Sequence, residues 1–126
     1  MSNELVQFLR GRLDEDEQVA RRASGRKEGG GSWAFEGTSV RAGDDAPVLR
    51  HTWATEGEHI TRHDPARVLR EVEAKRLIVD RYADLSGEGW KPSAPRVVRL
   101  QELRDSVRCL ALAYADHPDY RDEWRP

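Results

Sequence analysis

The chain has little of what most functional signatures need, beginning with cysteine. Its 126 residues hold one cysteine, which excludes an intramolecular disulfide and a zinc site built from several cysteines. No apolar run approaches the roughly 18 residues of a membrane-spanning helix, and the acidic N-terminal region is unlike a signal peptide. Neither a Gly-Lys-Ser/Thr triplet nor a GxGxxG pattern occurs, so the sequence predicts no phosphate cradle. We therefore expect a cytoplasmic protein that binds no membrane and holds no cofactor.

Net charge and lysine are also scarce. The formal charge of −2 gives no overall attraction to nucleic acid or to anionic lipid. Lysine occurs only at positions 27, 75 and 91, and the other basic residues apart from histidine are arginines. The codon usage of a GC-rich genome explains this bias more simply than a selected phosphate-binding role does. Hydrophobic residues make up 37% of the chain, so we expect a small core to which the four tryptophans contribute large buried areas.

The order of hydrophobic patterns predicts one α+β domain over residues 1–126. Apolar residues recur at helical spacing from Leu5 to Leu13, which predicts a first helix over 3–23. A glycine-rich loop at 25–32 and a β region at 33–54 follow, and Val48 to Trp53 has the clearest strand pattern. Further helices are expected at 58–63, 65–84 and 97–115, with a docked tail at 116–126. The predicted fold is an N-terminal helix, a short antiparallel β-sheet, and two or three C-terminal helices packed on it.

A helix start is encoded in the middle of the chain, where Asp64 precedes Pro65. Proline disfavours helix at the preceding residue and suits the first helical position, and aspartate is a good N-cap. The pattern therefore predicts a break after the short helix 58–63. It also predicts that the Asp64 carboxylate accepts a hydrogen bond from a backbone N–H near Arg67.

The last predicted helix has the most regular apolar pattern in the chain. Its apolar positions alternate in steps of three and four, as in two packed helices, and comprise Leu100, Leu103, Val107, Leu110 and Tyr114. We expect the face that carries Leu103, Val107 and Leu110 to lie inside the domain.

Cys109 lies beside that face. A catalytic thiol needs an adjacent base and an accessible, electropositive setting, so the neighbouring Leu110 favours a buried and inert thiol. In the polar tail that follows, Tyr120 and Trp124 indicate that the segment docks rather than frays. The same two aromatic residues are candidates for contact with a partner.

Three blocks of sequence carry a resemblance to a family. They read FLRxRLDEDE over residues 8–17, HIxRHDPARVLREVEAKR over 59–76 and YADHPDYRxEW over 114–124. In this order they resemble a small family of uncharacterised proteins from actinomycetes and their phages, a domain of unknown function. The blocks lie at both ends and in the middle of the chain, and they identify a family without implying a mechanism.

The resemblance carries one expectation about metal. Many members of the family have a Cys-x-x-Cys-His element and a further cysteine before the last helix, a set that suits structural zinc. This chain has the sequence GEGWKP over residues 87–92 instead, and Cys109 falls where the family pattern is apolar. The resemblance therefore implies no family-type zinc site here.

Two histidines form the best candidate for chemistry. His59 and His63 are four residues apart, so on a continuous helix they would share a face and could both ligate zinc. A structural role beside the Asp64 N-cap, with hydrogen bonds to the backbone, is the simpler interpretation, and we predict no metal. His117 is read in the same way, as a residue of the helix end and the following turn. The candidates for the further ligands that a zinc site would need are His51, Asp64, His117 and Asp119, none at diagnostic spacing.

Arginines around the predicted break are candidates for partner contact, namely Arg62, Arg67 and Arg70. Carboxylates interrupt this positive charge at Glu71 and Glu73. We infer a noncatalytic small interaction or accessory protein of phage origin, with an unknown protein partner, present as a monomer or homodimer. The alternative is a DNA- or RNA-associated regulator that uses the arginine-rich helix. A metal-dependent enzyme at His59 and His63 is third.

Overall fold

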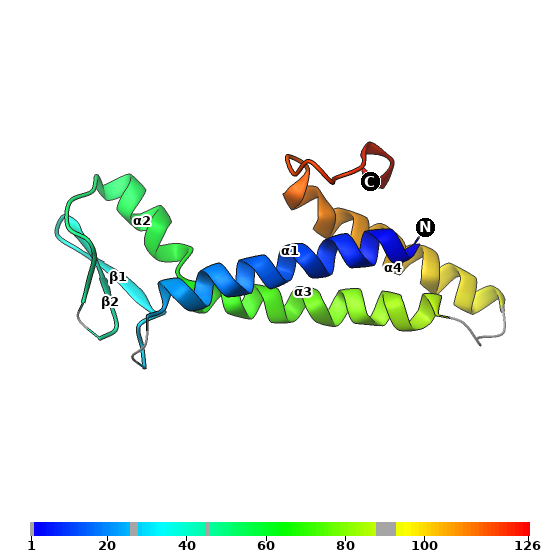
Figure 1. Ribbon diagram of the computed structural model, residues 1–126, viewed down its shortest axis with the longest axis horizontal. Helices are drawn as coiled ribbons and strands as arrows, with labels where there is room; N and C mark the ends of the chain where they lie inside the picture. The colour runs from blue at the N-terminus through cyan, green and yellow to red at the C-terminus, as the bar shows by residue number, and fades with distance from the viewer. Residues whose placement is uncertain (1, 26–27, 45, 88–92) are drawn as a thin grey trace. The chain divides into compact units, whose positions relative to one another are not determined.

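The computed structural model describes residues 2–25, 28–44, 46–87 and 93–126 (Figure 1). Residues 88–92 of the segment in which the resembling family has cysteines lie outside these ranges. Helix α1 (Ser2–Ala23) is followed by strands β1 (Trp33–Glu36), β2 (Ser39–Ala42) and β3 (Pro47–Leu49). Helices α2 (Ala54–Arg62), α3 (Pro65–Ser86) and α4 (Ala94–Ala111) come next, then the 3-10 turns η1 (Leu112–Tyr114) and η2 (Asp122–Trp124). The predicted α+β class is confirmed.

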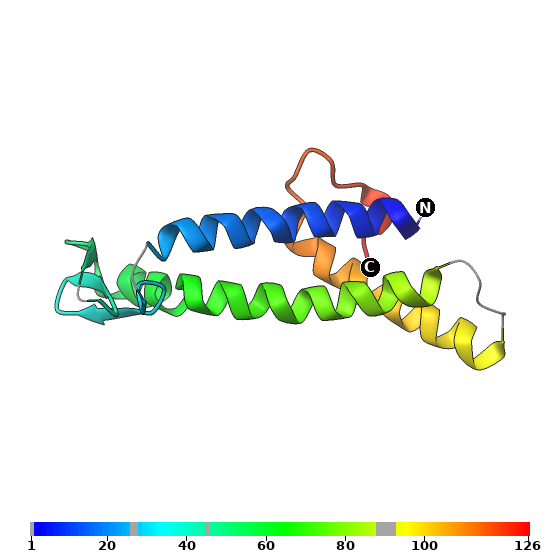
Figure 2. The same ribbon diagram turned by 60° about the horizontal axis from the view of Figure 1, so that its bottom comes forward.

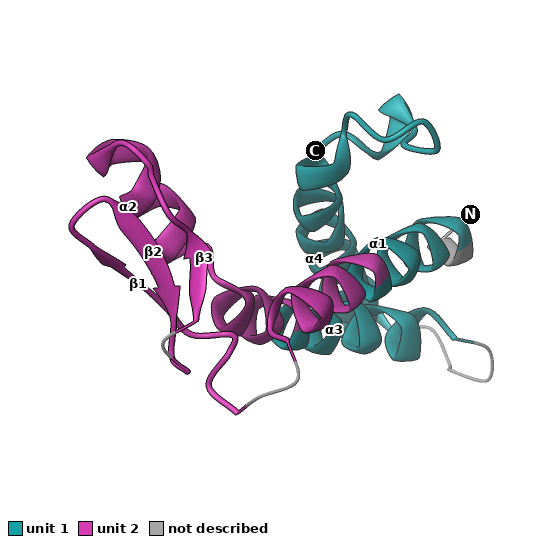
Figure 3. Cartoon of the chain, turned by 60° about the vertical axis from the view of Figure 1, so that its left-hand side comes forward, with its two compact units in different colours: residues 1–14, 73–126 teal, residues 15–72 magenta. Residues whose placement is uncertain are grey.

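These elements form two compact units (Figure 3). Unit 1 comprises residues 1–14 and 73–126, and unit 2 comprises residues 15–72. Helices α1 and α3 therefore each contribute one end to unit 1 and the other end to unit 2. No helix in the described ranges is long and apolar enough to cross a membrane.

In unit 1, residues 2–14 of α1 lie antiparallel to residues 73–86 of α3 (Figures 1 and 2). Two ion pairs fix this register, Arg10 with Asp80 at 2.9 Å and Arg76 with Asp14 at 2.7 Å. Both pairs are substantially exposed, so each contributes little stability by itself. Apolar burial stabilises the unit more strongly, and its buried side chains include Leu5, Leu9, Leu13, Val79, Tyr82 and Val107. The predicted apolar stripe of the first helix is confirmed.

Helix α4 begins at Ala94, three residues before the predicted start. The Ser93 hydroxyl oxygen accepts a hydrogen bond from the Arg96 N–H at 3.4 Å, and a proline follows in the first turn, which favours a helix start here. Val107 and Ala111 are completely buried, so the prediction for Val107 is confirmed. The helix ends at Ala111, and a 3-10 turn continues to Tyr114.

Cys109 is exposed, so the prediction of a buried thiol was wrong. The buried stripe of α4 passes through Val107 and Ala111, four residues apart. A residue two positions after Val107 lies about 200° further round the helix, since each residue turns it by about 100°. Proximity in sequence to Leu110 therefore did not place the thiol on the buried face.

The C-terminal tail docks on α1 within unit 1, as predicted. The Phe8 ring lies 5.1 Å from the Trp124 ring and 5.5 Å from the His117 ring, measured between centroids. Tyr114 and Tyr120 approach the same phenyl ring edge-on at 6.3 and 6.1 Å. Trp124 is only 6% exposed, so this aromatic cluster buries most of the largest side chain of the tail.

In unit 2 the three strands form an antiparallel sheet in the order β1-β2-β3. Phe35 lies opposite Val40, and Val40 lies opposite Leu49, so these three side chains share one face of the sheet. Helix α2 packs on this face through Gly57, which is buried. A Cβ atom at Gly57 would lie 2.5 Å from the Phe35 ring, so only glycine allows this close approach.

The region between the sheet and α2 differs from the sequence prediction. The strand expected over Val48 to Trp53 ends at Leu49, and the helix expected from residue 58 begins at Ala54. Gly57 lies within α2, where the absence of a Cβ atom allows the close approach to the Phe35 ring, and this packing offsets the low helix propensity of glycine. The alternation of Leu49, His51 and Trp53 continued past the true strand end, so periodicity alone placed the boundary too late.

Helix α3 begins at Pro65 after a break, as the sequence predicts. An oxygen of the Asp64 carboxylate, Oδ1, accepts a hydrogen bond from the Arg67 N–H at 2.9 Å. The Asp64 carbonyl accepts from the Val68 N–H at 3.1 Å, and Pro65 has no N–H to satisfy. The predicted N-cap is confirmed to the residue.

The Asp64 cap also ties α3 to the sheet. Its second oxygen, Oδ2, accepts a hydrogen bond from the Trp33 N–H at 3.0 Å, at the start of β1. The Gly31 carbonyl accepts from the Ala66 N–H at 3.0 Å, which satisfies the remaining donor of the first turn of α3. One carboxylate thus fixes both the helix start and the strand start.

Candidate interaction surface

Trp53 is the most exposed large hydrophobic residue among those described, with 82% of its surface in solvent. It occupies the N-cap position of α2 in an extended conformation, with φ −68° and ψ 151°. Its carbonyl accepts a hydrogen bond from the Gly57 N–H at 2.8 Å, so its backbone is fixed by the helix. The exposed indole therefore extends from a fixed backbone, and it can serve as an anchor for a partner.

Strand β3 adds two partly exposed apolar residues just before Trp53. Val48 is 40% exposed and Leu49 is 38% exposed. The register pairs Val40 with Leu49 and Arg41 with Pro47, which leaves Val48 as the extra residue of a β-bulge. We call the exposed side chains of Val48, Leu49, Arg50 and Trp53 the edge surface.

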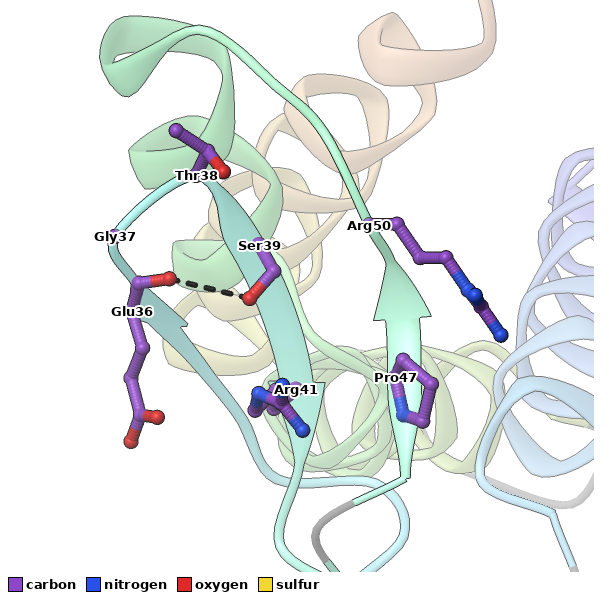
Figure 4. Close-up of a pocket in the computed structure, with 7 residues that line it drawn as sticks. All are labelled: Glu36, Gly37, Thr38, Ser39, Arg41, Pro47 and Arg50. Carbon is purple, nitrogen blue, oxygen red and sulfur yellow. Dashed lines mark hydrogen bonds between the residues drawn. The ribbon is translucent and has the colours of Figure 1, made fainter.

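An open groove lies on the sheet beside the edge surface (Figure 4). It has a volume of about 470 Å³, and its lining comes from the end of β1, the β1–β2 turn, β2, β3 and the residue after β3. The lining residues are Glu36, Gly37, Thr38, Ser39, Arg41, Pro47 and Arg50. Arg50 belongs to both the groove and the edge surface, so the two are continuous.

Hydrogen bonds hold the groove in shape. The Ser39 hydroxyl donates to the Glu36 carbonyl at 3.1 Å across the β1–β2 turn, in which Gly37 has a φ of 64°. The Thr52 N–H donates to the Thr38 carbonyl at 2.8 Å, which joins the segment before Trp53 to the groove wall. Figure 4 shows the Arg41 and Arg50 side chains on either side of Pro47.

The two histidines lie together at the end of α2. Their ring centroids are 4.4 Å apart. The helix is interrupted at Asp64, but His63 is still the C-cap residue of α2, so it stays close to His59. The His63 Nδ1 atom lies 2.8 Å from the His59 carbonyl oxygen, the backbone hydrogen bond that the structural interpretation expects. In the part of the chain that the structure describes, no three His, Cys, Asp or Glu side chains gather as a metal site would need.

The remaining metal candidate has other contacts. His117 belongs to unit 1, where its ring packs on Phe8 and its Nδ1 accepts a hydrogen bond from the Asp119 N–H at 3.0 Å. That bond closes the turn after α4, and the sequence analysis also assigns His117 to this turn.

Two of the three arginines proposed for partner contact are paired with glutamates of their own helices. Arg62 pairs with Glu58 at 3.1 Å, and Arg67 pairs with Glu71 at 2.9 Å, each across one helical turn. Arg70 is exposed on α3. The aromatic candidates Tyr120 and Trp124 belong to the cluster around Phe8.

Sequence reasoning did not find the edge surface, because the strand pattern assigned Trp53 to a sheet face. One signal was available: Trp53 is followed by Ala-Thr-Glu, with the acidic residue in what is now the first turn of α2. An acidic first turn is typical of a helix start. This signal predicts the N-cap position for Trp53 instead of a position in a strand. Nothing in the sequence indicates that the capping side chain points into solvent.

Comparison with known proteins gives the family. No curated protein and no solved structure showed significant similarity to the chain. The profile of DUF6221, a family of unknown function, matches residues 2–126, and the chain therefore belongs to this family.

Proposed function

We propose that the chain is a noncatalytic protein-interaction module of the cytoplasm, and that a protein partner binds its edge surface with Trp53 as the anchor. The observation that carries this proposal is the 82% exposure of Trp53, which follows the exposed Val48 and Leu49 of β3 in the chain. Tryptophan is enriched among the residues that dominate binding energy at protein interfaces. Its position on a hydrogen-bonded helix cap keeps the backbone entropy lost on binding small.

The other two functions have weaker support. Nucleic-acid binding through α2 and α3 would need exposed, uncommitted arginines, and Arg62 and Arg67 instead pair with glutamates of their own helices. A metal-dependent reaction would need a third ligand beside His59 and His63. An origin in actinobacteria or their phages belongs to the same proposal and rests on the three sequence blocks.

The test is capture followed by reconstitution. The full chain is immobilised and exposed to extract of its own source cells, alongside the Trp53→Ala variant and a control, Leu77→Ala. Leu77 is 56% exposed on the α3 part of unit 1, so its truncation removes a comparable apolar surface elsewhere. A protein identified by mass spectrometry is then purified and mixed with each variant.

We expect a purified partner that binds the wild type and the Leu77 variant but not the Trp53 variant. Binding that survives Trp53→Ala would contradict the proposed surface. Retention of DNA or RNA from the extract, rather than of a protein, would move the regulator function to first place.

A further inference from the structure

We propose that His59 and His63 form a two-histidine chelate, which binds one divalent transition-metal ion of the zinc class through a ring nitrogen of each residue. The two rings meet at the end of α2 although the helix is interrupted at Asp64, and this observation revises the expectation of no metal. The proposal concerns binding and no reaction, and it does not depend on the edge surface or on Trp53.

The two histidine rings lie close enough to share one ion. Their centroids are 4.4 Å apart, and their planes are inclined by 35°. Bonds of about 2.0–2.1 Å from zinc to two imidazole nitrogens, at a tetrahedral angle, place those nitrogens roughly 3.3–3.4 Å apart. Both side chains are exposed, so small rotations of the rings can bring two nitrogens to that separation.

A backbone hydrogen bond prepares His63 as a ligand. Its Nδ1 atom lies 2.8 Å from the His59 carbonyl oxygen. A carbonyl oxygen only accepts, so Nδ1 carries the proton, and Nε2 of the neutral ring keeps the lone pair that a metal ion needs. Histidines that bind metal usually donate their other ring N–H to such an outer partner, which fixes the orientation of the ring.

The charges around the pair are compatible with a cation. Arg62 pairs with Glu58 at 3.1 Å. Arg67, which donates a hydrogen bond to the Arg62 carbonyl, pairs with Glu71 at 2.9 Å. Both arginines are therefore matched by a carboxylate, and the carboxylate of Asp64, the next residue in the chain, adds negative charge that favours a bound cation.

The ligand set selects the class of ion. Imidazole nitrogens suit zinc, copper and nickel, whereas calcium and magnesium prefer oxygen ligands. In the part of the chain that the structure describes, no third His, Cys, Asp or Glu side chain joins the pair. Water would complete the coordination, so we expect weaker and more readily reversed binding than at a structural zinc site with four protein ligands.

The experiment titrates zinc chloride into the full chain, without an affinity tag and after treatment with a chelator, and measures the heat of binding. The variants are His59→Ala, His63→Ala and a matched control, His51→Ala. His51 is an exposed histidine of the same unit outside the pair. His59→Ala is the more specific variant, because alanine keeps the backbone carbonyl that accepts the His63 hydrogen bond. Thermal melts with and without zinc give a second measurement.

We expect one zinc ion per chain and a higher melting temperature in its presence, since a ligand that binds only the folded state stabilises that state. His59→Ala and His63→Ala should each weaken binding by at least about tenfold, the smallest usual effect of losing even an outer partner of a metal site. His51→Ala should leave the affinity unchanged, and magnesium chloride should not bind.

Absence of zinc binding at millimolar concentration would overturn the proposal, and so would a His59→Ala variant that binds zinc as the wild type does. Equal weakening by His51→Ala would also overturn it, because zinc would then bind surface histidines in general. One ion per two chains, with a doubled mass in solution, would contradict a site within one chain. Circular dichroism checks that each variant is folded, and His63→Ala decides the outcome if His59→Ala is not.

Discussion

At the scale of single residues, Trp124 and Trp53 show how the surroundings of a tryptophan side chain decide its role. Trp124 is 6% exposed against Phe8, and Trp53 is 82% exposed on the cap of α2. The same substitution to alanine therefore removes a core contact in one case and solvent-exposed surface in the other.

Trp124→Ala should destabilise the protein by about 3–5 kcal/mol, the usual cost of truncating a buried aromatic residue. Trp53→Ala should change the free energy of unfolding by less than about 0.5 kcal/mol, since it touches little else. Urea unfolding followed by circular dichroism compares the two. Equal destabilisation would mean that Trp53 is packed in solution.

Asp64 gives a second prediction at this scale, because its two oxygens serve different elements. Asp64→Ala removes both the Arg67 and the Trp33 hydrogen bonds and should cost about 1–2 kcal/mol. Glu73→Ala, at an exposed position of the same helix, is the control and should be nearly neutral. A thermal melt of Asp64→Ala that matches the wild type would show that the Asp64 cap does not stabilise the protein.

At the scale of elements, what the sequence predicts depends on how local its signals are. The start of α3 is predicted to the residue, because Asp64 and Pro65 carry the signal themselves. The start of α2 is missed, because Gly57 owes its place in the helix to Phe35, more than twenty residues earlier. Cys109 is misplaced for a related reason: which face of α4 is buried depends on other elements. The candidate surface is the least predictable part, since exposure of Trp53 has no sequence signature.

Gly57 provides the element-scale test. Gly57→Ala should destabilise the protein although alanine favours helix, because the added Cβ meets the Phe35 ring at 2.5 Å. Gly11→Ala is the matched control, since nothing lies within 4 Å of its Cβ position in α1, and it should stabilise by up to about 1 kcal/mol. Chemical unfolding of both variants shows whether each substitution raises or lowers the free energy of unfolding. Stabilisation by both would show that α2 does not pack on the sheet through Gly57.

The packing of α4 has its own test. Val107→Asp buries an unpaired charge at a fully buried position and should cost several kcal/mol, on the order of 3 or more. Val98→Asp, on the same helix at 54% exposure, should be close to neutral. Differential scanning calorimetry reports both, and a tolerated Val107→Asp would remove α4 from the core.

At the scale of the whole molecule, the chain is predicted to unfold as one domain. Helices α1 and α3 each run through both units, so loss of one unit should carry the other with it. We expect one urea transition, displaced as a whole by Asp64→Ala in unit 2 and by Val107→Asp in unit 1. Two separate transitions, each moved by only one variant, would contradict the single domain.

The central claim is that Trp53 anchors a protein partner, and calorimetric titration of the reconstituted partner tests it most directly. Trp53→Ala should raise the dissociation constant about 30-fold or more, which corresponds to the 2 kcal/mol or more of an interface hot spot. Leu77→Ala should leave the dissociation constant within about twofold of wild type, as for a residue outside the interface. Equal affinities for the wild type and the Trp53 variant, with both folded, would contradict the claim.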